Sequence, residues 1–78
     1  MQTNRIELKW KMHSFVRFTA SACGFDVEVY KSGPGWIHTI TKGEELVDHG
    51  MYHPPTNNNE LAVKVQSERA LYEIIEAL

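Results

Sequence analysis

The sequence predicts a small α+β domain, with a mostly antiparallel sheet of about four strands and one or two helices packed on one face of it. Three observations predict this fold. The 78 residues suit a single compact domain that spans residues 1–78. Residues 4–12 and 25–30 alternate apolar and polar side chains, as half-buried strands do. Residues 67–78 carry apolar side chains at helical spacing.

The first expected element is a strand over residues 4–12. Apolar and polar side chains alternate through it without interruption. The apolar face holds Ile6, Leu8, Trp10 and Met12, and the polar face holds Arg5, Glu7, Lys9 and Lys11. A period of two places one set on the core and the other in solvent.

Residues 14–23 fit either a helix or a strand, and the helix is favoured. Ser14 is a good N-cap, and Gly24 suits the left-handed position that follows a helix. Cys23 would then lie on the apolar side of the helix, as an inert buried thiol. The alternative strand needs a tight hairpin at Cys23 and Gly24, and it leaves Phe15 in solvent.

Residues 25–41 predict a β-hairpin. Alternating residues lead into "SGPG", in which two glycines and a proline favour a turn, and "WIHTIT" makes the return strand. Residues 41–50 then fit either a short helix that ends at Gly50 or a third strand over residues 44–48.

The C-terminal part predicts a strand over residues 60–65 and a helix over residues 67–78. Ser67 would cap this helix, and Glu68 would lie at its positive end. A continuous helix from Glu60 is disfavoured, because it would place Ser67 and Glu68 on the apolar side.

The composition predicts a soluble cytoplasmic protein. The single cysteine cannot form an intramolecular disulfide, and no stretch resembles a signal peptide or a membrane span. The charge is divided along the chain. Residues 1–42 carry six basic and three acidic groups, a sum of +3, whereas residues 43–78 carry two basic and seven acidic groups, a sum of −5. Such polarity can orient a partner or pair two copies of the chain.

The sequence holds no pattern that favours catalysis or a cofactor, so we expect a non-enzymatic protein. Glu44 and Glu45 are adjacent and would point apart, and "SGPG" leads into a strand where a phosphate-binding loop would lead into a helix. His49 and His53 have the spacing of a zinc pair, but Gly50 disfavours the helix that such a pair needs. We therefore expect no metal.

Protein recognition is the favoured function. The expected loop over residues 50–59 contains two prolines, which lower the entropy cost of binding. Met51, Tyr52 and His53 are the candidate contact residues, together with Trp36, because aromatic side chains are enriched in binding hot spots. The same loop could serve only as a connector. A free sheet edge is a second candidate, which could add a strand from a partner or from a second copy in a homodimer.

Two other functions remain open. Arg5, Lys9 and Lys11 could bind nucleic acid, with Trp36 and Tyr30 as stacking surfaces. The pI of about 6.0 argues against this reading, since such proteins are usually basic.

A module that responds to pH or metal through its histidines is the third function. The histidines concerned are His38, His49 and His53. Size and lack of motifs favour a protein-binding inhibitor or adaptor, of the kind that phages encode as counter-defence proteins.

Overall fold

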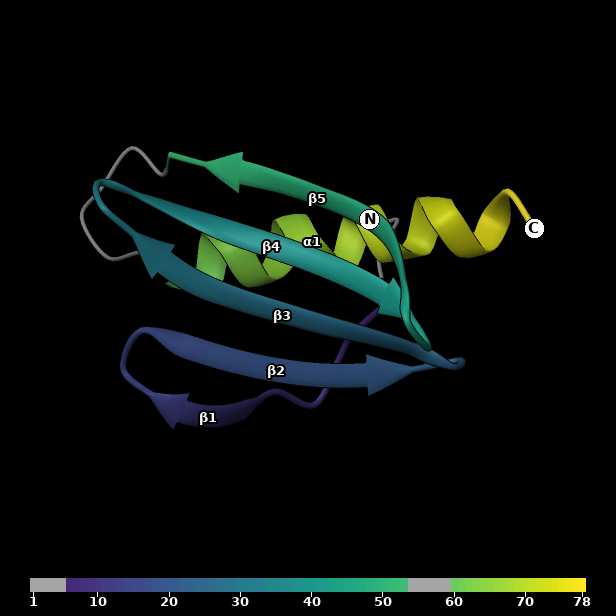
Figure 1. The fold of residues 1–78 in the computed structure, drawn as a ribbon, viewed down its shortest axis with the longest axis horizontal. Helices are drawn as coiled ribbons and strands as arrows, with labels where there is room; N and C mark the ends of the chain where they lie inside the picture. The colour runs from purple at the N-terminus through teal and green to yellow at the C-terminus, as the bar shows by residue number, and fades with distance from the viewer. Residues whose placement is uncertain (1–5, 54–59) are drawn as a thin grey trace.

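The computed structural model describes residues 6–53 and 60–78, which form a five-stranded antiparallel sheet with a helix against one face (Figure 1). The strands follow one another in space as they do in sequence, from β1 to β5. Their bounds are β1 Lys11–Ser14, β2 Arg17–Ala22, β3 Phe25–Ser32, β4 Gly35–Lys42 and β5 Glu45–Tyr52, and the helix α1 is Glu60–Glu76. The α+β prediction is confirmed, with five strands in the described residues where about four were expected.

The predicted hairpin over residues 25–41 is confirmed as β3 and β4. Val29 pairs with His38 at its centre, and Ser32 pairs with Gly35 at its end. The turn between them consists of Gly33, at a φ of 58°, and Pro34. A positive φ at the first turn position matches the twist of the strands, and only glycine adopts it without strain.

The helix favoured for residues 14–23 is wrong, and the alternative strand is correct. Arg17–Ala22 forms β2, which buries Phe18 against the core and pairs with β3. The two central turn residues, Cys23 and Gly24, have φ values of 54° and 82°. This conformation suits a two-residue hairpin. Cys23 is therefore exposed at a turn, and not on an apolar helix face.

The first strand is shorter than predicted, because pairing begins only at Lys11. The apolar residues before Lys11 nevertheless face the core as predicted. Leu8 is buried, and Ile6 and Trp10 pack against the same cluster. Met12 departs from the pattern and is 60% exposed. Arg5 lies outside the described residues.

The C-terminal helix is continuous from Glu60 to Glu76, so the strand predicted over residues 60–65 and the helix start at residue 67 are wrong. The feature that disfavoured this helix is present in the structure, since Ser67 and Glu68 are buried at 0% and 3% exposure. The Ser67 hydroxyl donates to the backbone carbonyl of Val63 at 2.8 Å. Burial is tolerated because such partners replace water.

Glu68 owes its burial to the N-terminal segment. Its Oε2 accepts hydrogen bonds from the backbone N–H of Leu8 and from the indole Nε1–H of Trp10, each at 3.0 Å. The backbone N–H of Ile6 donates to the Glu68 carbonyl at 3.5 Å. The carboxylate and the backbone carbonyl of Glu68 therefore hold residues 6–10 against α1, and sheet pairing begins only at Lys11.

The strand alternative for residues 44–48 is correct, as part of β5 Glu45–Tyr52, and the helical alternative for residues 41–50 is excluded. Lys42 pairs with Glu45 around a turn in which Gly43 has a φ of 65°. The strand β5 continues to Tyr52, so the loop predicted over residues 50–59 begins with residues of the sheet. Residues 54–59 lie outside the described part of the chain.

Two adjacent buried clusters make up the core between the sheet and α1. The first contains Leu8, Phe25, Val27, Ile40 and Leu71, and the second contains Phe18, Val29, Trp36 and Val63. Because α1 covers only this side, the opposite face of the sheet is open, and it is the face nearer the viewer in Figure 1.

Candidate functional site: the β5 edge

The two edges of the sheet differ in length and in chemistry. The β1 edge has four residues, a register shift between Met12 and Ser14, and a lysine at Lys11. The β5 edge has eight residues, "ELVDHGMY", with no lysine, arginine or proline. Short strands, irregular pairing and lysines are the usual means of preventing edge-to-edge association. In the part of the chain that is described, β1 has all three, whereas β5 is long and lacks lysine; its protection consists of one register irregularity, opposite Ile40 and Thr41, and the carboxylates of Glu45 and Asp48.

Apolar side chains are exposed along β5. Leu46 and Met51 pair with Thr41 and Ile37 of β4, which places them on the open face. They are 53% and 55% exposed, and Val47, at the register irregularity, is 37% exposed. A free edge with an apolar strip beside it can provide both the backbone hydrogen bonds and the side-chain contacts of an added strand.

The middle of β5 is fixed to β4 by a buried histidine. The Nε2–H of His38, which is 7% exposed, donates to Oδ2 of Asp48 at 3.0 Å. Gly50 lies directly opposite His38, and a Cβ there would be 3.0 Å from the Cε1 atom of the ring. Glycine lets the strand pass close to the imidazole. This contact and the hydrogen bond together hold the β5 backbone in place.

The end of β5 carries three of the four predicted contact residues. Met51 lies on the open face, and Tyr52 lies on the helix side of the sheet, opposite Trp36. His53 follows Tyr52, and its ring packs over Gly35. A Cβ added at Gly35 would lie 3.0 Å from Cε1 of His53. Trp36, the fourth predicted residue, is 1% exposed in the core. Its ring is therefore not accessible as a surface anchor or as a stacking surface.

Tyr52 also lines a shallow groove between β5 and α1, of about 340 Å³. The helix contributes the rest of the lining. These residues are Leu61, Ala62, Val65, Gln66 and Arg69. An extended segment laid along β5 would place alternate side chains toward this groove, because successive side chains of a strand point to opposite faces.

The residues of the nucleic-acid hypothesis are on a different surface. Lys9 and Lys11 line a hollow of about 590 Å³ on the open face, over β1 to β4. Asp26 and Glu28 line the same hollow. Carboxylates at this position oppose a phosphate backbone, since like charges repel.

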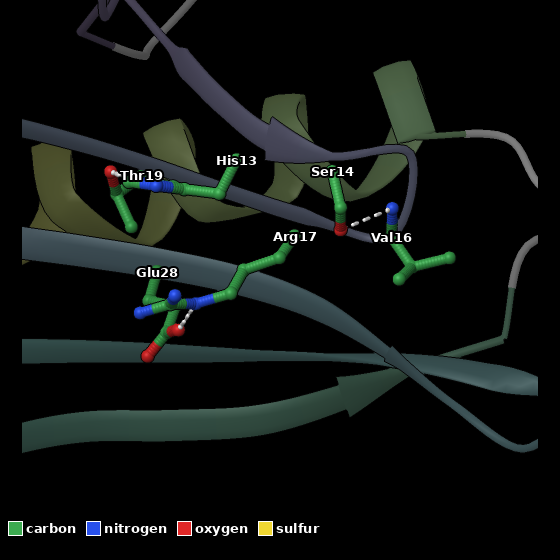
Figure 2. Close-up of polar contacts among 6 residues, drawn as sticks. All are labelled: His13, Ser14, Val16, Arg17, Thr19 and Glu28. Carbon is green, nitrogen blue, oxygen red and sulfur yellow. Dashed lines mark hydrogen bonds and ion pairs between the residues drawn. The ribbon is translucent and has the colours of Figure 1, made fainter.

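Neighbouring side chains on this face are already paired (Figure 2). The guanidinium of Arg17 donates from Nε to Oε2 of Glu28. Nε2 of His13 lies 2.7 Å from the hydroxyl oxygen of Thr19. Arg17 and Glu28 therefore neutralise each other, so Asp26 is the carboxylate of the hollow that opposes a phosphate backbone.

The histidines of the third hypothesis do not converge. His38 lies on the helix side of β4, His49 lies on the open face of β5, and His53 lies over Gly35. Within residues 6–53 and 60–78, no group of three or more His, Cys, Asp or Glu side chains is arranged to hold a metal ion.

Sequence reasoning missed Leu46, Val47 and the pair of His38 with Asp48. The alternation of "ELVDHGMY" was the signal that could have indicated an exposed strand face. Two adjacent apolar residues, Leu46 and Val47, interrupt that alternation at the register irregularity.

Comparisons with protein-family models, with curated proteins and with solved structures found no match to this chain. None of the helices in the described ranges is long and apolar enough to cross a membrane. The site alone therefore supports the functional argument.

Proposed function

We propose that the protein is a non-enzymatic protein-binding module, which adds an extended segment of its partner to the β5 edge. The observation that supports this most directly is the eight-residue free edge, which lacks the lysines and prolines that block strand addition and exposes Leu46, Val47 and Met51 beside it. Strand addition takes its affinity from main-chain hydrogen bonds and its specificity from alternate side chains.

The residues at the end of β5 have distinct roles in this proposal. Met51 contacts the partner on the open face, where its flexible side chain adapts to different shapes. Tyr52 contacts the partner at the groove beside α1, and His53 extends the surface beyond the strand. Binding of this kind suits an inhibitor or an adaptor, because an occupied partner segment is withheld from its other contacts.

The proposal is tested by affinity capture from a cell lysate, with and without nuclease, read by mass spectrometry. Wild-type protein is compared with Met51→Lys and with Met12→Lys. Met12 is a matched control, since it is 60% exposed on the opposite edge and receives the same charge. We expect a protein partner that survives nuclease and is lost only from Met51→Lys. Equal capture by both variants would exclude the β5 edge.

Nucleic-acid binding is the second candidate, supported by the position of Lys9 and Lys11 in the lining of the open-face hollow. Its discriminating feature is salt dependence. Phosphate contacts weaken steeply between about 50 and 200 mM salt, whereas an interface with apolar contacts at its centre weakens less. Capture that disappears with nuclease and with Lys9→Ala plus Lys11→Ala would favour this candidate over the edge.

A further inference from the structure

The β5 edge carries carboxylates just before its start, at its start and at its centre, and none of its residues is a lysine or an arginine. Glu44 and Glu45 are exposed at its start, and the side chain of Asp48 is 42% exposed at its centre. Two cations of the described residues lie at its ends. Lys42 is opposite Glu45, with its ammonium 5.4 Å from the centroid of the Phe25 ring, and Arg69 lines the groove beside Tyr52. The edge therefore presents the carboxylates of Glu44 and Glu45 at its start and that of Asp48 at its centre, where Asp48 also accepts the hydrogen bond from His38.

The negative charge of the β5 edge decides which of two occupants it favours, a second copy of this chain or an extended segment of another protein. A second copy paired through β5 would bring the carboxylates of Glu44, Glu45 and Asp48 from both chains to one interface, where like charges repel one another. A segment that carries Lys or Arg would instead gain an attractive interaction with each carboxylate and would be steered toward the edge.

The two faces of β5 also differ, which sets the order of side chains in the occupant. Leu46 and Met51 lie on the open face, whereas Glu45 and Asp48 lie on the helix side. Residues opposite each other in paired strands share a face. On the basis of the proposed function, we infer that the β5 edge binds an extended partner segment with alternating apolar and basic side chains. The apolar ones lie over the open face, and the basic ones lie over the carboxylates.

The test measures binding of two blocked peptides to ¹⁵N-labelled protein by NMR, one of alternating valine and lysine and one of alternating valine and glutamate. We expect the lysine peptide to bind about tenfold more tightly, as two or three solvent-exposed ion pairs allow. Its chemical-shift changes fall on residues 45–52, and the preference decreases in high salt.

A charge-swap variant makes the test specific to this edge. Glu44→Lys with Glu45→Lys should reverse the preference and bind the glutamate peptide more tightly. The control, Glu7→Lys with Asp26→Lys, changes the net charge equally at exposed positions away from β5 and should keep the preference for lysine.

The outcomes separate this inference from the proposed function. Equal binding of both peptides at β5 would overturn the charge preference and leave strand addition in place. A lysine peptide that shifts the resonances of β1 and β2, and not those of β5, would overturn the inference, and the capture experiment alone would then decide the proposed function.

Discussion

Replacing Glu68 tests how the N-terminal segment is held on the helix. Its Oε2 accepts two hydrogen bonds, from the Leu8 backbone and the Trp10 indole, in a site where Glu68 is 3% exposed. Each hydrogen bond to a charged group contributes about 1.5–3 kcal/mol. Glu68→Ala leaves both donors without this acceptor, so we expect a loss of about 3–5 kcal/mol in the free energy of unfolding. The total for a chain of this size is about 4–12 kcal/mol.

Glu68→Gln separates the hydrogen bonds from the charge. Because both donors use the same oxygen, an amide oxygen in that position keeps both bonds, and we expect a loss of only about 1–1.5 kcal/mol. Urea unfolding followed by tryptophan fluorescence measures both variants. Glu73→Ala, at an exposed position of the same helix, controls for the change in helix composition. Equal losses for Ala and Gln, or a loss below about 1 kcal/mol for Ala, would refute the reasoning.

Further predictions concern β5 and the lysines of the open face. Gly50→Ala should cost about 1–3 kcal/mol of stability, because its Cβ would lie 3.0 Å from the buried His38 ring; an unchanged urea midpoint would show that the ring moves freely. Tyr52→Ala with His53→Ala should weaken partner binding about tenfold or more. This double variant should remain folded by circular dichroism, and full affinity would remove the end of β5 from the site. Lys9→Ala with Lys11→Ala should leave binding of a protein partner within about twofold of wild type, as titration calorimetry can show.

The sequence predicts those parts of the fold that depend on residues close to one another along the chain. The hairpin of β3 and β4 follows from local alternation and from "SGPG", whose Gly33 adopts the positive φ that the turn requires. The segment over residues 14–23 was misassigned because Ser14 and Gly24 resemble helix caps. In the structure the Ser14 hydroxyl accepts a hydrogen bond from Val16 N–H, and Gly24 belongs to a hairpin turn.

The helix start was missed for a non-local reason. The burial of Glu68 depends on Leu8 and Trp10, which lie some sixty positions earlier in the chain, and no pattern within residues 60–78 reveals those partners.

In the candidate site too, features set by local residue types were predictable, and features that depend on distant parts of the chain were not. The local residue types of Met51, Tyr52 and His53 predict a contact surface, and the structure places Met51 and Tyr52 on opposite faces at the end of β5, with His53 directly after the strand. The accessibility of Trp36 could not be predicted, because its burial depends on the pairing of β4 with β5 and on the helix behind them. The exposure of Leu46 and Val47 likewise depends on which strand forms the edge of the sheet.

Amide hydrogen exchange across β5, measured with and without the captured partner, tests strand addition most directly. An added strand would form hydrogen bonds with the outward N–H groups of Glu45–Tyr52, so their exchange should slow while that of β1 stays unchanged. Protection confined to β1 and β2, or unchanged exchange over β5 in a saturated complex, would contradict binding through this edge.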